Sequence, residues 1–212
     1  GFRSANLIAD NFGLLASSRD IKIDGKLGME EAWNAGVNLS QTIKIWGDRE
    51  MSIALDYYHT NFVNQVVVDY DKDANQVWFS NLDGKSYSNA AQLDINIEPL
   101  EGFNISLAGR YNDVMTTYHG ELMQKPYVSK WKGLVVLSYK TKYDKWMFDL
   151  TTQFNGKQRV PLNVGYNKEY APGYIYMLAQ ITRKFKNFDV YVGAENLTDY
   201  KQDTPVFGAD QP

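Results

Sequence analysis

Apolar and polar residues alternate along most of this sequence. Between residues 33 and 45, apolar side chains dominate the odd positions and polar or small side chains fill the even positions. The same period recurs in seven further segments: 51–58, 87–97, 103–111, 131–139, 146–154, 175–181 and 188–194. Successive side chains of a strand point to opposite faces, whereas an amphipathic helix repeats every 3.6 residues, a period that no segment sustains. The sequence therefore predicts an all-β chain of about eight antiparallel strands.

The connections between these segments alternate in length. The links near 46–50, 98–102, 141–145 and 185–187 are short, whereas those at 61–86, 112–130 and 156–173 are long, polar and rich in Tyr, Asn, Asp and Lys. Barrels of the bacterial outer membrane have short periplasmic turns and long extracellular loops. The segments, of 7 to 13 residues, are also close to the roughly 9–11 residues that a tilted strand needs to cross a bilayer. We therefore expect an antiparallel up-and-down transmembrane β-barrel formed by four hairpins within residues 31–200.

The two predicted faces of the strands differ in chemistry. The polar face carries charged and amide groups that suit a water-filled lumen better than a packed core. Its predicted lumen-facing residues are Asn34, Asn38, Asp56, Asp94, Arg110, Asp149, Gln153 and Glu195. The apolar face ends in aromatic residues, which are enriched where a barrel meets the lipid headgroups. The predicted membrane-interface aromatics are Trp33, Trp46, Tyr111, Trp131, Tyr139, Trp146, Phe154 and Phe188.

The composition limits the remaining classes of protein. A formal net charge of -3 gives no basic footprint for nucleic acid, and 44% hydrophobic residues argue against wholesale disorder. The absence of cysteine excludes a disulfide scaffold and a thiolate metal site. An ordinary antiparallel sheet with one solvated face also alternates in this way. A soluble secreted β-sandwich that binds a ligand therefore remains an alternative.

The two ends of the chain suggest that it is part of a longer protein. No targeting segment follows Gly1, and residues 207–212 are turn-like and complete no strand. If the long connections are extracellular, residues 1–30 form an extracellular segment and residues 201–212 form the last extracellular loop. A barrel with an even number of strands then needs one more strand after this loop. We therefore expect the final strand to be missing.

Four stretches resemble the TonB-dependent outer-membrane receptors, especially those of the Bacteroidetes type. They are GFRSAN at 1–6 with LLASSR at 14–19, EAWNAG at 31–36, FSNLDGKS at 79–86 and YVGAENLTDY at 191–200. The last stretch is similar to the penultimate strand of the family, in which an acidic or amide residue and Asn-Leu precede an aromatic residue. These motifs belong to the barrel wall and name no substrate.

The resemblance implies that residues 1–212 are the C-terminal portion of a barrel of 22 strands, a size found among plugged outer-membrane transporters. The plug domain would lie upstream, outside this chain. The implied function is active uptake of a bulky nutrient, such as a siderophore, haem, a cobalamin-like molecule or a glycan. The implied partners are the TonB energy-coupling complex, acting through the plug, and the lipid and lipopolysaccharide of the outer membrane. A passive porin or an adhesive barrel is the alternative within the membrane class.

Few residues suggest chemistry beyond binding. Gly84-Lys85-Ser86 lacks the first glycine of a phosphate-binding loop, and an alternating segment follows it instead of a helix. With two histidines and no cysteine, we expect neither an enzyme nor a bound cofactor. Two loop clusters contain residue types that bind metals, but their spacing matches no metal-site pattern, so we expect neither to hold a metal: Met115, His119, Glu121 and Met123, and then Asp71, Asp73 and Asp83.

Aromatic and charged residues of the long connections are the better candidates for ligand binding. Aromatic rings beside hydrogen-bonding groups suit a bulky polar ligand at the mouth of a barrel. The predicted ligand-binding residues are Trp78, Tyr118, Arg159, Tyr166 and Tyr170. The alternative for each of them is that it packs loop against loop or contacts lipopolysaccharide.

Overall fold

The computed structural model describes residues 1–17, 19–161 and 169–202, and most of these residues lie in strands. Its helical elements are short: α1 (Leu7–Asp10) and the 3-10 turns η1 (Phe12–Ala16) and η2 (Lys142–Asp144). None of the helices in the described ranges has the length and hydrophobicity needed to cross a bilayer. The prediction of an all-β antiparallel chain is confirmed.

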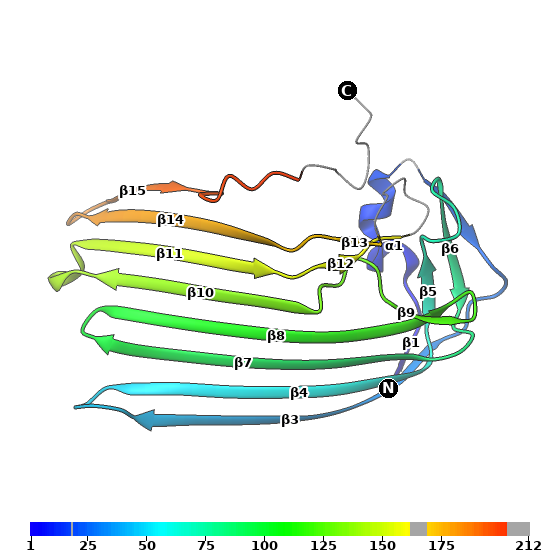
Figure 1. Ribbon diagram of the computed structural model, residues 1–212, viewed down its shortest axis with the longest axis horizontal. Helices are drawn as coiled ribbons and strands as arrows, with labels where there is room; N and C mark the ends of the chain where they lie inside the picture. Colours follow the sequence, from blue (N-terminus) through cyan, green and yellow to red (C-terminus); the bar gives the residue numbers. More distant parts are fainter. Residues whose placement is uncertain (18, 162–168, 203–212) are drawn as a thin grey trace.

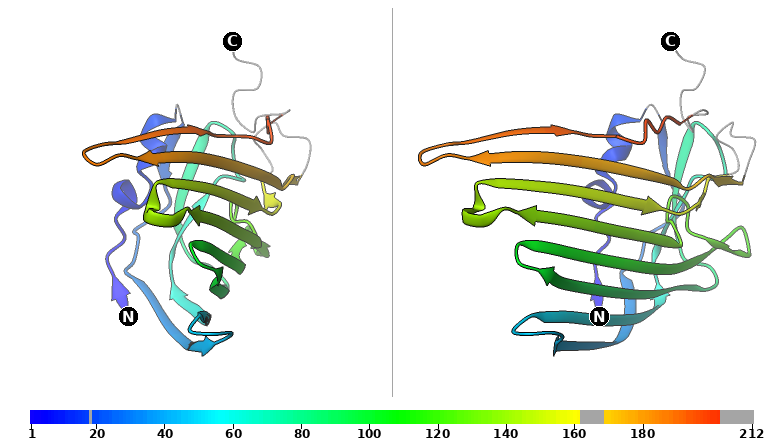
Figure 2. Two further views of the ribbon diagram at one scale, coloured as in Figure 1. Left: turned by 90° about the vertical axis from the view of Figure 1, so that its left-hand side faces the viewer. Right: turned by 60° about the vertical axis from the view of Figure 1, so that its left-hand side comes forward.

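One large curved sheet contains the eight strands that the alternation predicts (Figure 1, Figure 2). Its strands pair in the order β1-β3-β4-β7-β8-β10-β11-β14-β15, and β9 pairs with β8. The bounds are β1 Phe2–Arg3, β3 Glu30–Lys44, β4 Glu50–Asn64, β7 Ser86–Leu100, β8 Phe103–Tyr118, β9 Glu121–Gln124, β10 Trp131–Lys140, β11 Trp146–Asn155, β14 Tyr174–Lys184 and β15 Asp189–Ala194. All pairings within this sheet are antiparallel.

The connections of the large sheet separate to its two ends. Short turns join β3 to β4, β7 to β8, β10 to β11 and β14 to β15, and they gather at one end, which we call the turn end (Figure 1). The longer connections gather at the opposite end, which we call the loop end. Each short turn thus closes an antiparallel hairpin between neighbouring strands.

Four strands are longer than the sequence predicts. β3, β4 and β7 have 15 residues each and β8 has 16, whereas β10, β11 and β14 have 10 or 11. The predicted length of roughly 9–11 residues is therefore wrong for the first four strands, and it is also wrong for β15, which has 6 residues. Their pairing continues toward the loop end, as in Asn89 opposite Asp113 and Ser86 opposite Thr116. Backbone pairing needs no apolar side chains, so it extends past the stretch that alternation marks.

The register gives the large sheet two distinct faces. Ile53, Ile95, Leu107 and Val135 lie opposite one another across β4, β7, β8 and β10. This apolar face is largely exposed, with Leu39 at 61% of its full accessible surface. Residues of the other parity form the polar face, on which Asp56 lies beside Asn38. Such exposure of large apolar side chains is typical of a surface that faces lipid.

A small second sheet stands at the loop end. It consists of β2 (Asp20–Ile23), β6 (Gln76–Asn81) and β5 (Val66–Asp69), with β2 parallel and β5 antiparallel to β6. In Figure 1 these strands run crosswise to the long strands. Val66, Val77 and Phe79 form a buried core here, against which Leu7, Leu14 and Leu27 pack. The connection at 61–86 is therefore not simply a polar loop, and the 1–30 segment is its packing partner.

Candidate functional site

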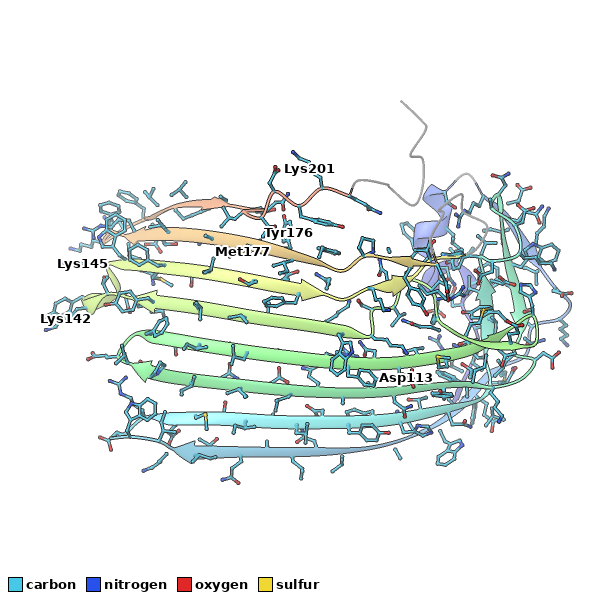
Figure 3. The ribbon with its side chains drawn as sticks, viewed as in Figure 1. Asp113, Lys142, Lys145, Tyr176, Met177 and Lys201 are labelled. Atoms are coloured by element: carbon cyan, nitrogen blue, oxygen red, sulfur yellow. The ribbon has the colours of Figure 1, made fainter. Side chains whose placement is uncertain are left out.

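The loop end of the sheet is the candidate site, because separate connections fold together there. The small sheet supplies one part, and the β8–β9 hairpin supplies a second. The third part is the short pair β12 (Gln158–Arg159) and β13 (Tyr170–Ala171). We call these three parts, with the segments that join them, the loop-end unit. Figure 3 shows its side chains crowded at the end of the ribbon that is opposite the short turns.

A polar cavity of about 280 Å³ lies between the small sheet and the β8–β9 hairpin. Its lining is rich in charged groups and contains two large aromatic side chains, Trp78 and Tyr118. The residues that matter for its chemistry are Asp24, Asp69, Lys72, Trp78, Asp83 and His119. Hydroxyl and amide groups of Ser80 and Asn81 complete the wall. Such a cavity can accept a polar group through hydrogen bonds and ring contact.

The β8–β9 turn places His119 against the small sheet. His119 and Gly120 have φ values of 51° and 82°, and they form a two-residue hairpin loop between β8 and β9. The Nε2 atom of His119 lies 2.9 Å from Oδ2 of Asp69. The other carboxylate oxygen of Asp69 accepts a hydrogen bond from the Asp71 backbone N–H at 2.7 Å. Both oxygens of this buried carboxylate are therefore engaged.

The Trp78 ring is held on both its edge and its face. Its Nε1–H donates to Oε1 of Gln76 at 3.0 Å, and the ammonium group of Lys72 lies 3.4 Å from the ring centroid. Asp24 and Asp83 are exposed at the cavity rim, where no described residue forms an ion pair with either carboxylate. The rim thus offers free acceptors, while the ring face is already covered by a cation.

Arg159 lies in the interior of the loop-end unit, not at its surface. The side chain is 2% exposed and makes a bidentate ion pair with Asp71, at 3.0 Å and 2.6 Å. Its Nε donates to the carbonyl of Gln124 at 2.6 Å, and its guanidinium lies 5.5 Å from the centroid of the Tyr118 ring. This arrangement joins the small sheet, β9 and β12 through one buried cation. Removing either partner of such a pair would leave an uncompensated charge in the interior.

The predicted ligand-binding residues are therefore distributed unevenly. Trp78 and Tyr118 both line the cavity, although Tyr118 is only 3% exposed. Tyr170 lies opposite Arg159 in the β12–β13 pair, with the ammonium group of Lys157 at 4.9 Å from its ring centroid. Tyr166 lies outside the described residues. A ligand-binding role for these five residues stays a prediction, and Arg159 already has the loop-packing contacts of the alternative.

The predicted lumen-facing residues all belong to the polar face. Asn38 donates to Asp56 at 2.6 Å, and Ser138 donates to Asp149 at 2.6 Å. Further hydrogen bonds on this face join Asn34 to Thr60, Gln92 to Asp94, Arg110 to Asn112 and Tyr176 to Glu195. Gln153 is in register with Leu134 and Tyr176. That this face lines a lumen stays a prediction.

Most of the predicted interface aromatics lie on the apolar face, in two groups. Toward the loop end, Trp33, Tyr111, Trp131 and Phe154 share this face, and the Tyr111 and Trp131 rings are 4.6 Å apart. Toward the turn end, the group comprises Tyr139 and Trp146 on the face, and Trp46 and Phe188 in the turns. Eight positions separate Trp131 from Tyr139, about 26 Å along a strand. Because the strands of an outer-membrane barrel tilt by about 35–45°, this length spans about 20 Å of height, slightly less than the apolar band of about 25 Å.

Several residues of the two loop clusters with metal-binding residue types have other partners in the structure. Asp71 pairs with Arg159, and Asp73 accepts from the Asn75 backbone, whereas Asp83 lies at the cavity rim. His119 pairs with Asp69. Within the described part of the chain, no group of three or more His, Cys, Asp or Glu residues is placed to hold a metal ion.

Sequence reasoning missed several residues of the cavity. Asp24, Asp69 and Lys72 were not singled out, because they come from segments that only tertiary folding brings together. The pairing of β2 with β6 spans 56 positions, from Asp20 to Gln76. The one local signal was the run Val66-Val67-Val68, whose β-branched side chains favour a strand inside the 61–86 connection.

Solved structures with a similar fold exist, although no family model and no curated protein matches the sequence. The chain is similar to the copper transporter OprC, with a TM-score of 0.68 and 12% identity over 94% of this chain and 30% of that one. It is also similar to the ferric-catecholate import receptor Fiu of Escherichia coli K12, with a TM-score of 0.59 and 12% identity over 82% and 24% of the two chains.

A third similar structure is the ferripyoverdine receptor of the outer membrane of Pseudomonas aeruginosa. The TM-score is 0.56 at 16% identity, over 82% of this chain and 24% of the receptor. The chain thus spans less than a third of the length of these transporters and receptors. Sequence identities this low support a shared fold but give no information about the ligand. The fold of this chain is that of the wall of an outer-membrane β-barrel.

Proposed function

We propose that this chain is the C-terminal part of the barrel of a TonB-dependent outer-membrane receptor of the Bacteroidetes type. The observation that carries the proposal is the two-faced, two-ended sheet, with an apolar exposed face, a hydrogen-bonded polar face and its long connections all at one end. In this assignment the apolar face contacts lipid, the polar face lines the lumen around the plug, and the loop end is extracellular.

The proposed activity is uptake of a bulky nutrient that first binds at the loop end. The charged cavity beside Trp78 is a binding surface for a polar group of such a solute. Similar structures are named as a ferric-catecholate import receptor, a ferric preacinetobactin receptor and a copper transporter. Metal complexes are therefore the first ligands to test, before haem, cobalamin-like molecules and glycans. Transport would be driven by the TonB energy-coupling complex acting on the plug.

The orientation is testable because the chain has no cysteine of its own. Asn75→Cys places a thiol before β6 at the loop end, and Asn187→Cys places one in the β14–β15 turn. Both positions are exposed, so they form a matched pair. In intact cells that produce the parent protein, a membrane-impermeant maleimide should label Asn75→Cys and should reach Asn187→Cys only after the outer membrane is permeabilised.

Uptake of ferric chelates by the same cells tests the transport step. It should require both the parent protein and an intact TonB complex. Equal labelling of both cysteines in intact cells would contradict the orientation, and recovery of the protein in the soluble fraction would contradict a membrane barrel. Uptake that continues without the TonB complex would instead identify a passive porin.

A further inference from the structure

Two neighbouring turns at the turn end carry an unusual concentration of positive charge. The β10–β11 turn contributes Lys142 and Lys145, which Figure 3 shows at the tip of the ribbon, and the β14–β15 turn region contributes Arg183, Lys184 and Lys186. The two turns are directly joined, because the backbone N–H of Lys184 donates to the carbonyl of Lys145 at 2.9 Å. We call these five cations the basic patch.

Few acidic residues offset the positive charge of the basic patch. Within residues 141–145 and 183–189 the acidic residues are Asp144 and Asp189, and Asp189 is in register with Lys184. None of the five cations has a carboxylate within ion-pair distance among the residues that the structure describes. Four of the five are exposed, and Arg183 is half-buried. The patch therefore presents a net positive charge to whatever lies beyond the turn end.

Aromatic rings surround these cations at the edge of the apolar face. The Arg183 guanidinium lies 4.7 Å from the ring centroid of Trp146 and 5.5 Å from that of Phe185, which stacks on Phe188. In the β10–β11 turn, Tyr143 is 78% exposed. One layer further from the turns, Phe148 pairs with an isoleucine on the apolar face. The cations thus lie where the apolar face ends, at the level of lipid headgroups.

The other half of the turn end does not have this character. The β7–β8 turn is flanked by Glu98 and Glu101, and Glu98 accepts a hydrogen bond from the Gly102 backbone at 2.8 Å. The β3–β4 turn carries one cation, Arg49, beside Asp48. Trp46 still lies at this level, with its Nε1–H donating to the carbonyl of Pro99. Aromatic residues therefore lie along the whole turn end, whereas the excess positive charge is confined to one half.

We propose that the basic patch binds the phosphate headgroups of anionic phospholipids in the inner leaflet of the outer membrane. Charge complementarity selects this lipid, because Lys and Arg beside a membrane surface attract anionic headgroups while the adjacent rings insert at the interface. The proposal rests on the proposed function, which places the turn end at the periplasmic side. It predicts that anionic lipid is enriched beside Trp146 and not beside Trp46.

Quenching of tryptophan fluorescence by brominated lipid tests this prediction. Two single-tryptophan versions of the full chain, one retaining Trp146 and one retaining Trp46, are prepared by replacing the other four tryptophans with Phe. Each is reconstituted in bilayers of phosphatidylcholine with a minority of phosphatidylglycerol, and either lipid carries the bromine. Relative to quenching by brominated phosphatidylcholine, quenching by brominated phosphatidylglycerol should be at least twofold stronger at Trp146 than at Trp46.

The triple variant Lys142→Gln, Lys145→Gln and Lys186→Gln removes exposed charge without touching the packed rings. It should lower the phosphatidylglycerol quenching of Trp146 to the level of Trp46, since each cation near a charged membrane contributes about fivefold in binding. The preference should also fall as salt is raised. Inorganic phosphate at millimolar concentration should leave the preference unchanged, and loss of the preference in phosphate would instead assign the patch to a soluble anion.

The outcomes separate the two proposals. Equal phosphatidylglycerol quenching of Trp146 and Trp46, with strong quenching by brominated phosphatidylcholine, would overturn the lipid site and leave the barrel in the membrane. A lack of quenching by either brominated lipid would show that the chain does not insert, and would overturn the proposed function as well.

Discussion

Arg159 and Asp71 are separated by 88 positions and still make the most buried ion pair of the described chain. A local pattern cannot reveal such a pair, because neither residue lies in an amphipathic segment that places the other. The sequence singled out Arg159 as a ligand-binding residue and Asp71 as a possible metal ligand. Both expectations were based on a charged group in a loop. The structure shows that the two groups neutralise one another.

Loss of one partner of this pair should destabilise the loop-end unit. Arg159→Met leaves Asp71 buried without its main counter-charge, which costs about 3–5 kcal/mol. The double variant Arg159→Met with Asp71→Leu should recover most of that loss. Limited proteolysis of the detergent-solubilised protein measures the opening of the loops. Lys130→Met, which breaks a half-buried but long (3.8 Å) pair with Asp113, is the control and should change stability by about 1 kcal/mol or less. Equal effects of Arg159→Met and Lys130→Met would contradict this account.

The stability of the loop-end unit should depend on pH in the alkaline range because of Tyr127. Burial raises the pKa of its phenol from 10.0 to about 12, and its ring packs edge-on against Tyr70 at 6.0 Å. Because the folded pKa is raised, the stabilisation is complete below about pH 10 and is lost as the pH rises toward 12. Burial also raises the pKa of Tyr70 and Tyr118, so absorbance at 295 nm should show several phenols that ionise late, and Tyr127→Phe should reduce their number by one. An unchanged number of late-ionising phenols in Tyr127→Phe would contradict the role of Tyr127.

At the scale of elements, the alternation predicted the eight long strands and the face on which each side chain lies. It succeeded because a period of two depends only on the geometry of the strand itself. It missed β5 and β6, which lie in a connection dominated by polar residues. It also underestimated β3, β4, β7 and β8, because hydrogen bonds between neighbouring strands continue beyond the apolar stretch.

The β7–β8 turn depends on its glycine. Gly102 has a φ of 76°, and a Cβ atom there would collide with the carbonyl oxygen of Lys140 in the adjacent strand. Gly102→Ala should therefore cost more than the about 1–2 kcal/mol of left-handed backbone alone. Gly47→Ala in the β3–β4 turn, where φ is 61° and no atom lies within 4 Å, should cost only the backbone part. Urea denaturation in detergent micelles compares the two, and equal midpoints would refute the contribution of the collision.

At the scale of the whole molecule, the large sheet is open. Along β3, only Glu30 and Glu31 pair with β1, and β15 is paired on one side within the described residues. A long edge strand beside an exposed apolar face is a template for association. The alternation of short and long connections predicted how the strands of this sheet are connected, because the length of a connection depends on the topology and not on any one contact.

The isolated chain should consequently self-associate in the absence of detergent. Sedimentation velocity should show oligomers or aggregates in buffer, and a smaller, discrete species after a zwitterionic detergent is added. The detergent covers the apolar face, whereas the unpaired edges remain available. A monodisperse monomer in detergent-free buffer would contradict the membrane-facing assignment of the apolar face.

The parallel pairing of β2 with β6 also constrains the order in which the chain folds. The hairpins of the large sheet close over a few residues each, whereas β2 and β6 must meet across 56 positions. Closing a long flexible segment costs conformational entropy that grows with its length. Because the β3–β4 hairpin lies between β2 and β6, its prior formation shortens the flexible part of that segment. We therefore expect the wall to form first. The cavity at the loop end should then form only after the β3–β4 hairpin is in place.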